Sequence, residues 1–384
     1  MIDIHSLINR DKTEISISSE YWTHLKKTYT QDEIKEAISS AIDTFDLPMP
    51  LSHISEADAE TAFQKLIDFD VNSLINEGDV FSRYEYKYDF SPFYIGQSNV
   101  GNESSNYFHQ LSRFYCDSIN APSPYRSWTI PKFRNGILNA LFTLKFDEVN
   151  SSKLRTAISL RKYLAAQFKP SVAKLIYEKF DAKNVLDFSS GWGDRLAGFY
   201  ATENTVKYTG IDPNLRLHTG YYDQGLMYSK FMSKSHEIHY GCAEDVLPTL
   251  NETYDMVFTS PPYFNIERYT QEENQSWKKY RKLDAWINDF LFPVLKESWN
   301  RLEDGGFMIV NISDVYSNHQ VNNICDPMND YISSMPFANY MGSLGMRMTK
   351  RPNSKSQQDG TFVEPMWVFS KGKTSSLEEI LSKK

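Results

Sequence analysis

The sequence predicts an α/β protein with a doubly wound, mostly parallel sheet and a mainly helical N-terminal region. After residue 150, short apolar runs bounded by turn residues alternate with helical stretches, which is typical of parallel strands joined by crossover helices. Before residue 150, apolar residues recur at helical spacing instead. We therefore expect two parts, residues 1–150 and residues 151–384.

Residues 1–150 contain two segments with the periodicity of amphipathic helices, from Asp32 to Phe45 and from Glu56 to Ile75. The aromatic stretch from Phe81 to Pro131 has no strong periodicity. Its glycine, asparagine and serine content predicts loops.

Residues 151–384 begin with a long helical pattern that has an expected break before Pro170, and a further helix is expected from Asp284 to Leu302. Six apolar runs predict strands: NVLDF (184–188), YTGID (208–212), IHYGCA (238–243), YDMVFTS (254–260), GFMIVNIS (306–313) and PMWVFSK (365–371).

Composition and charge exclude several classes of protein. No apolar run approaches the roughly 20 residues that cross a bilayer, and the charged N-terminal segment is unlike a secretory signal, so we expect a cytoplasmic protein without a membrane partner. The net charge of −8 gives no global basic footprint for nucleic acid, although a local basic face can suffice. The cysteines and histidines show no ligand spacing, so we expect no metal site; those considered are Cys116, Cys242, Cys325, His218, His236 and His239.

The segment VLDFSSGWGDR (185–195) predicts a cofactor site. A strand ends at Asp187, and a turn with Ser189, Gly191 and Gly193 opens a helix. Glycines let the backbone approach a ligand closely, and ligands of open α/β sheets lie beyond the carboxyl ends of the strands. Leu196 stands where the third glycine of a dinucleotide fingerprint would fall, and no phosphate loop of the G-x-x-x-x-G-K-[ST] type occurs.

Two further strand ends carry acidic residues. Asp212 follows the glycine turn by about twenty residues, where a carboxylate can bind ribose hydroxyls. Glu244 and Asp245 follow the third strand and are suited to an adenine edge. This ordered set predicts a nucleoside cofactor.

The loop after the strand YDMVF reads TSPPYF (259–264), and its two prolines stiffen it. It resembles the S-P-P-Y motif of amino-directed DNA methyltransferases, particularly the N4-cytosine type, whereas the N6-adenine type more often has D-P-P-Y. FKP (168–170), GGFMIV (305–310) and EPMWVFSK (364–371) look like further motifs of this family, so the resemblance covers about residues 155–371. DFSSGWGD (187–194) departs from the usual D-P-F-x-G-x-G-T, which indicates a divergent member.

The resemblance implies a class I, Rossmann-like methyltransferase that uses S-adenosylmethionine. The residues expected to hold this cofactor are Lys169, Pro170, Asp187, Ser189, Gly191, Gly193, Asp212, Glu244 and Asp245.

The implied target is an exocyclic amine of a DNA base, with cytosine N4 ahead of adenine N6 because of Ser260. Such an amine is a poor nucleophile, since its lone pair is delocalised into the ring. The family assigns its activation to the Ser260 hydroxyl and the Pro261 carbonyl, in a catalytic loop completed by Pro262 and Tyr263. Tyr263 would stack on a flipped-out base, a contact worth about 1–3 kcal/mol, and Phe264 would form part of the same wall.

DNA is the expected partner, RNA is the alternative, and protein partners stay open. A catalytically silent nucleic-acid-binding protein that retains the fold is the rival from another class. Residues 1–150 are the candidate for target recognition, because the catalytic part contains no large insertion. Basic residues near the site either bind phosphates or form a solvated face; they are Lys278, Lys279, Arg281, Lys282, Arg347, Lys350, Arg351 and Lys355.

Overall fold

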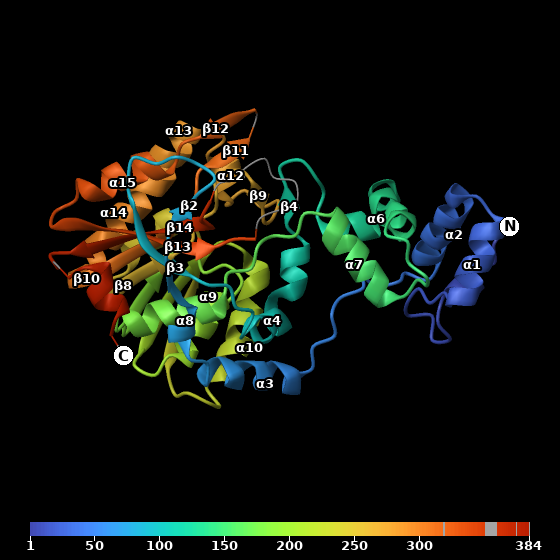
Figure 1. The fold of residues 1–384 in the computed structure, drawn as a ribbon, viewed down its shortest axis with the longest axis horizontal. Coiled ribbons are helices and arrows are strands. Elements are labelled where there is room, and N and C mark those ends of the chain that lie inside the picture. Colours follow the sequence, from blue (N-terminus) through green and yellow to red (C-terminus); the bar gives the residue numbers. More distant parts are fainter. Residues whose placement is uncertain (318, 350–358, 374, 384) are drawn as a thin grey trace. The chain divides into compact units, whose positions relative to one another are not determined.

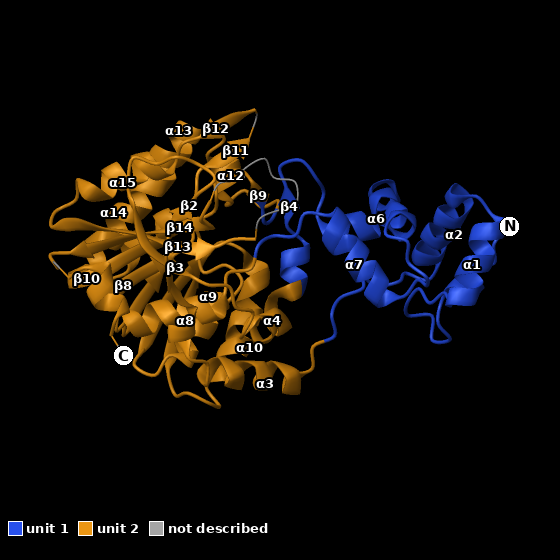
Figure 2. Cartoon of the chain, in the orientation of Figure 1, with its two compact units in different colours: residues 1–53, 111–166, 268–270 blue, residues 54–110, 167–267, 271–384 orange. Residues whose placement is uncertain are grey.

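The computed structural model describes residues 1–317, 319–349, 359–373 and 375–383 (Figure 1). The chain forms two compact units (Figure 2). Unit 1 comprises residues 1–53, 111–166 and 268–270, and unit 2 comprises residues 54–110, 167–267 and 271–384. The units do not follow the expected boundary at residue 150, because residues 151–161 pack in the core of unit 1 and residues 75–95 supply strands to the sheet of unit 2.

Unit 1 is helical. Its core gathers apolar side chains from every helix, and the indoles of Trp22 and Trp128 donate to the carbonyls of Phe146 (3.0 Å) and Leu47 (2.8 Å). The helix expected from Asp32 is confirmed as α2 and begins with a capping box at Thr30. The helices are α1 (Ser19–Thr28), α2 (Gln31–Thr44), α5 (Pro124–Thr129), α6 (Pro131–Thr143) and α7 (Ser151–Arg161), with a 3₁₀ turn at Ile4–Leu7.

Unit 2 contains the sheet, with the strand order β1-β3-β13-β14-β10-β8-β5-β6-β7. Strands β7, β6, β5, β8 and β10 are parallel, whereas β14 is antiparallel to both β10 and β13. The strands are β1 (Ile75–Glu77), β2 (Val80–Phe81), β3 (Phe90–Ile95), β5 (Asn184–Asp187), β6 (Lys207–Asp212), β7 (Ser235–Tyr240), β8 (Tyr254–Thr259), β10 (Leu302–Asn311), β13 (Ala338–Arg347) and β14 (Thr361–Lys371), besides the short β4 (Asp117–Ser118), β9 (Glu267–Arg268), β11 (Val315–Ser317) and β12 (Gln320–Asn322).

Helices cover both faces of the sheet (Figure 1). Successive residues of β8 show why both faces are apolar: Phe258 packs against Tyr177 of α8, while Val257 belongs to the cluster that includes Trp299 of α14. The helices are α3 (Glu56–Ile67), α4 (Asn102–Phe114, which ends in unit 1), α8 (Pro170–Lys179), α9 (Asp194–Ala201), α10 (His218–Tyr228), α11 (Ala243–Val246), α12 (Ser276–Lys279), α13 (Leu283–Ala285), α14 (Phe292–Arg301), α15 (Cys325–Ser333) and α16 (Leu377–Leu381).

The doubly wound, mostly parallel fold is therefore confirmed, and the six expected strands are β5, β6, β7, β8, β10 and β14. The helix expected from Asp284 is present as α13, a π-helical turn at Trp286–Leu291 and α14. The helix expected over Glu56–Ile75 ends at Ile67 and is followed by a 3₁₀ turn at Val71–Leu74.

The loops expected over Phe81–Pro131 were wrong for much of that stretch. It contains β3, α4 and α5, and β3 pairs in parallel with β13. These elements are short, and each is stabilised by partners that are distant in the sequence, so local periodicity did not predict them. Among the described residues, no helix is both long enough and apolar enough to span a bilayer.

Candidate active site

The strand order places the two predicted motifs at the same edge of the sheet. From the central strand β5, the chain continues outward through β6 and β7 on one side, and through β8 and β10 on the other. The topological switch point therefore lies between β5 and β8, and ligands of open α/β sheets bind outside the carboxyl ends of the strands at this point. The glycine turn follows β5, and the Ser-Pro-Pro-Tyr loop follows β8.

Asp187 at the end of β5 is fully buried and has four partners within the protein. Arg195 donates to its carboxylate from Nε (2.7 Å) and Nη2 (3.2 Å), Tyr208 donates its hydroxyl (2.6 Å), and Ser189 donates its backbone N–H (3.2 Å). Arg195 also donates to the Ser189 carbonyl. Asp187 and Arg195 thus fix the start of the glycine turn.

The glycine turn has one packed side and one open side. Gly191 and Gly193 adopt φ values of +65° and +72°, in the left-handed region. A Cβ at Gly193 would lie 2.2 Å from Oε1 of Gln224 and 2.7 Å from Nε2 of His109. A Cβ at Gly191 would meet nothing nearer than 3.8 Å. A ligand therefore has room beside Gly191 and none beside Gly193.

Helix α4 supports the packed side of the turn. Its Ser105 donates to Asp194, the first residue of α9, and Gln167 donates to the same carboxylate at 2.8 Å. His109 contacts Gln224 (3.1 Å between Nε2 and Oε1), and Gln224 donates to the Gly193 carbonyl at 2.8 Å. Burial lowers the pKa of His109 to about 4, so its ring is neutral near pH 7.

These supporting residues were not expected from the sequence. A signal for α4 was present, since polar residues recur there at spacings of three and four, at positions 102, 105, 106 and 109.

Asp212 at the end of β6 also belongs to the turn. Its carboxylate accepts the N–H of Gly191 (2.9 Å) and that of Asn214 (2.9 Å). The side chain is largely buried, and this burial raises the pKa of Asp212 to about 7 despite the two backbone donors. The residue expected to bind ribose hydroxyls therefore lies directly beside the open glycine.

The segment before α8 closes the site from another direction. The Phe168 ring packs edge-on against Phe258 (5.6 Å between ring centroids), and the Arg195 guanidinium lies 5.4 Å from the Phe168 ring centroid. Pro170 is buried at the first position of α8, and Nζ of Lys169 donates to Oδ1 of Asn99 at 2.8 Å. The expected motif upstream of the turn is thus connected to it through Arg195.

Glu244 and Asp245 begin α11, and Lys279 neutralises them. Nζ of Lys279 lies 2.6 Å from Oε1 of Glu244 and 3.6 Å from Asp245, and the Tyr280 hydroxyl donates to Glu244 at 2.8 Å. Lys279 was expected to contact phosphate, but its ammonium is engaged by these carboxylates.

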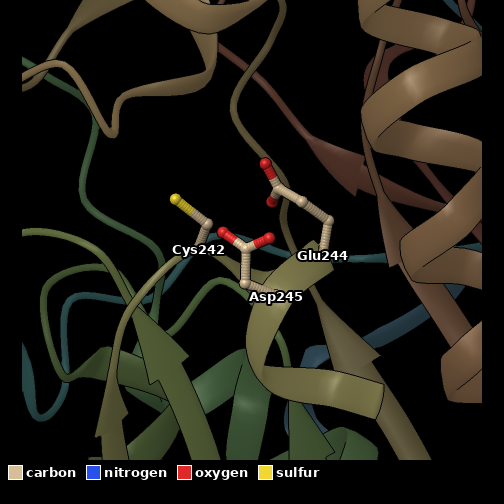
Figure 3. A group of neighbouring side chains, drawn as sticks. All are labelled: Cys242, Glu244 and Asp245. Carbon is tan, nitrogen blue, oxygen red and sulfur yellow. The ribbon is translucent and has the colours of Figure 1, made fainter.

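A cysteine joins these carboxylates (Figure 3). Potential ligand atoms of Cys242, Glu244 and Asp245 lie within 4.8 Å of one another. Burial raises the pKa of the Cys242 thiol to about 11, so the thiol stays protonated and donates to the Asn274 carbonyl (3.3 Å). Because Lys279 already supplies the positive charge and the thiol is neutral, this group does not fit a metal ion.

The Ser-Pro-Pro-Tyr loop is tied to β10 and β14. The Ser260 hydroxyl lies 3.5 Å from Oδ1 of Asn311, the Tyr263 hydroxyl lies 3.4 Å from the Asn311 carbonyl, and the Asn311 amide donates to the Pro365 carbonyl (3.1 Å). Ser260 and Tyr263 are partly exposed, and Pro261 is buried. Asn311 was not among the expected site residues, although it ends an expected strand.

Phe264 does not form part of a substrate wall. Its side chain is 4% exposed and packs in the core, with its ring 6.1 Å from that of Trp286. Its backbone has φ +53°, and its N–H donates to the Pro262 carbonyl at 2.9 Å. A non-glycine residue in this region costs about 1–3 kcal/mol, and burial of the ring in the core holds the loop in this conformation.

Glu364 is a further side chain beside the loop. Strand β14 pairs Met366 with Asn311, so Glu364 extends beyond the end of β10, on the side where Tyr263 lies. Burial raises the pKa of Glu364, and interactions with Tyr263 and Asn311 partly offset this effect.

Of the other basic residues expected to contact phosphate, Arg281 is exposed and Lys278 pairs with Glu273 (2.7 Å). Arg351, like Lys350 and Lys355, lies outside the described residues.

Comparison with known families gives one match. Residues 254–383 match the family of N6 and N4 methyltransferases described as DNA methylase. The matched segment is about a third of the chain and includes the Ser-Pro-Pro-Tyr loop, β10 and β14. No curated protein matches the chain.

Three solved structures illustrate the similarity of fold. The O-methyltransferase TomG from Streptomyces achromogenes is 13% identical, with 55% of this chain and 84% of that chain covered and a TM-score of 0.36. An rRNA methylase from Streptococcus thermophilus is 14% identical, with 54% and 99% covered and a TM-score of 0.32. The O-methyltransferase from Bacillus cereus is 10% identical, with 57% and 86% covered and a TM-score of 0.36.

These distant similarities add no detail about the site. The strand order establishes a Rossmann-like α/β fold, and the family match supports a methyltransferase that uses S-adenosylmethionine.

Proposed function

We propose that the protein transfers a methyl group from S-adenosylmethionine to an exocyclic amine of a DNA base, with cytosine N4 favoured over adenine N6. One observation carries the proposal. The Ser-Pro-Pro-Tyr loop lies across the switch point from the glycine turn, and it lies within the segment that matches DNA methylases. A methyl donor held at the turn and an amine held at the loop would therefore meet at one edge of the sheet.

The residues of the turn fit the cofactor. Gly191 leaves the space beside it open, the Asp212 carboxylate can accept from ribose hydroxyls, and Glu244 follows the next strand. Asp187 and Arg195 act as positioning residues, since their side chains hold each other and the turn. The bound cofactor supplies an activated methyl group on a sulfonium, so no nucleophilic side chain is needed.

The loop residues would prepare the amine. An acceptor on each N–H draws the nitrogen towards tetrahedral geometry and frees its lone pair. The Ser260 hydroxyl and the Pro261 carbonyl would be these acceptors, and Asn311 beside Ser260 orients the hydroxyl. Tyr263 would stack on the base and hold the amine in line with the methyl group. A base in a duplex must leave the stack to reach such a loop.

Methyl transfer from isotopically labelled S-adenosylmethionine tests the proposal. Unmethylated genomic DNA and total RNA serve as substrates, and modified nucleosides are then separated by mass. Ser260→Ala and Tyr263→Ala are compared with wild type, and Tyr222→Ala, which removes an exposed tyrosine on α10, is the matched control. We expect roughly a 10²-fold loss of rate for Ser260→Ala, by analogy with other single polar groups at reaction centres. Tyr263→Ala should weaken base binding by about 1–3 kcal/mol.

Each outcome bears on a different part of the proposal. Label in N4-methylcytosine that is lost in both variants supports it fully. Label in N6-methyladenine retains the mechanism and overturns the choice of base, and label in RNA overturns the choice of polymer. Binding of the cofactor without methylation of either polymer overturns the substrate class. Failure to bind S-adenosylmethionine would favour the catalytically silent alternative.

A further inference from the structure

Basic residues of unit 1 are concentrated in one segment. Residues 111–166 contain nine Lys and Arg against three Asp and Glu, whereas residues 1–53 contain five against nine. The whole chain has a net charge of −8. A local excess of positive charge in an acidic protein points to a surface that binds an anionic partner.

Three of these basic side chains meet around Phe133 on α6. The Arg126 guanidinium lies 5.5 Å from the Phe133 ring centroid, and Nζ of Lys132 lies 4.8 Å from it. Nζ of Lys162, which follows α7, donates to the Phe133 carbonyl at 3.1 Å. Arg126, Lys132 and Lys162 therefore form one group, here named the Phe133 cluster, although they come from three parts of the sequence.

The negative charge within this unit does not neutralise the cluster. Arg126 pairs with Asp117 (2.6 Å), but neither Lys132 nor Lys162 has a carboxylate partner among the described residues. The first turn of α6 contains no acidic residue. Like charges repel when they converge, and burial lowers the pKa of Lys162. An anion at this surface would relieve both effects.

The cluster is accessible to a large partner. Arg126 and Lys132 are exposed, and the Phe133 ring is partly exposed between them. Gly136, one turn further along α6, is exposed, and a Cβ there would meet nothing nearer than Nζ of Lys162 at 3.6 Å. The surface beside Lys162 is thus unobstructed by side chains of the described part of unit 1.

We propose that the Phe133 cluster binds the phosphate backbone of DNA. The choice of DNA as the partner rests on the proposed function, whereas the position of the surface rests on the cluster itself. Lysine and arginine that contact phosphates release condensed counterions, which makes the affinity depend steeply on salt. Such contacts position the polymer and carry no sequence information.

Salt-dependent binding of a fluorescently labelled DNA duplex to the full-length protein, without cofactor, tests this inference. The test variant is Lys132→Gln/Lys162→Gln, and the matched control is Lys26→Gln/Lys27→Gln, which removes the same charge from exposed positions on α1. Each lost phosphate contact should reduce the slope of log K against log salt by about 0.9. We therefore expect the slope of the test variant to fall by about 2 and that of the control to stay unchanged.

Two measurements keep the outcome clear. Lys132→Gln alone, at an exposed position, should reduce the slope by about 1 and guards against misfolding of the double variant. Affinity for S-adenosylmethionine, measured by calorimetry, should be the same in wild type and variants. If the wild-type protein does not bind the cofactor, the proposed function fails while the DNA measurement still stands.

Unchanged slopes in the test variants, equal losses in the control, or no binding of DNA by the wild type would overturn the inference. Binding of RNA or of anionic vesicles through the same lysines, without binding of DNA, would overturn the choice of partner.

Discussion

Alanine at Gly193 should destabilise the protein much more than alanine at Gly191, although the two glycines lie in one turn. Both adopt left-handed backbone angles, with φ values of +72° and +65°. An L-residue in this region costs about 1–2 kcal/mol. Only at Gly193 would the new Cβ also collide with neighbours, at 2.2 Å from Gln224 and 2.7 Å from His109. Overpacking of this kind costs about 1–3 kcal/mol more.

The free energy of unfolding should therefore fall by about 2–5 kcal/mol in Gly193→Ala and by about 1–2 kcal/mol in Gly191→Ala. Thermal unfolding followed by circular dichroism measures the difference, at about 2–4 °C per kcal/mol for a unit of this size. Gly191→Ala should instead weaken S-adenosylmethionine binding, because its Cβ would occupy the open side of the turn.

A double variant tests the assigned cause. Gln224→Ala removes the nearer of the two obstructing side chains, so Gly193→Ala/Gln224→Ala should lose less stability than the two single variants together. Equal stability of Gly193→Ala and Gly191→Ala would refute the packed and open sides of the turn. Strict additivity in the double variant would refute Gln224 as the obstruction.

Two further predictions concern the charged residues of the turn. Because burial raises the pKa of Asp212 from 3.8 to about 7, the folded chain holds this proton more tightly, and its contribution lowers the free energy of unfolding as the pH rises from about 4 to about 7. The ionised carboxylate is the better acceptor for ribose hydroxyls, so calorimetry should show S-adenosylmethionine binding about tenfold tighter at pH 8 than at pH 6; a dependence retained in Asp212→Asn would contradict this. Arg195→Met should cost about 3–5 kcal/mol by leaving the buried Asp187 charge unpaired, and Asp187→Asn/Arg195→Met should recover part of that loss. Urea unfolding measures both, and a single variant as stable as wild type would disprove the role of the pair.

Much of the fold and the candidate site could be predicted from local sequence. The strands β5, β6 and β8 are continuous apolar runs, because helices cover both faces of a parallel sheet. The glycine turn and the Ser-Pro-Pro-Tyr loop were recognisable because their backbone requirements are local. Their meeting at one edge then follows from the winding of the sheet.

Other features depend on partners far away in the chain. Helix α4 has no strong apolar stripe of its own, and its position under the turn is set by contacts such as Ser105 with Asp194 and His109 with Gln224. Phe264 carries an aromatic ring in a motif where stacking was expected, yet its strained backbone directs that ring into the core against Trp286.

By itself, the sequence determined the fold class, the order of the strands along the chain and the residues of both motifs, since these depend on composition, periodicity and turn chemistry over a few residues. Tertiary structure alone decided which charges are neutralised: Lys279 pairs with Glu244, whereas Lys132 and Lys162 meet at Phe133 with no carboxylate partner in the described part of the chain. The reason is physical. Electrostatic interactions depend on distances in space, and folding sets those distances between residues that the sequence keeps apart.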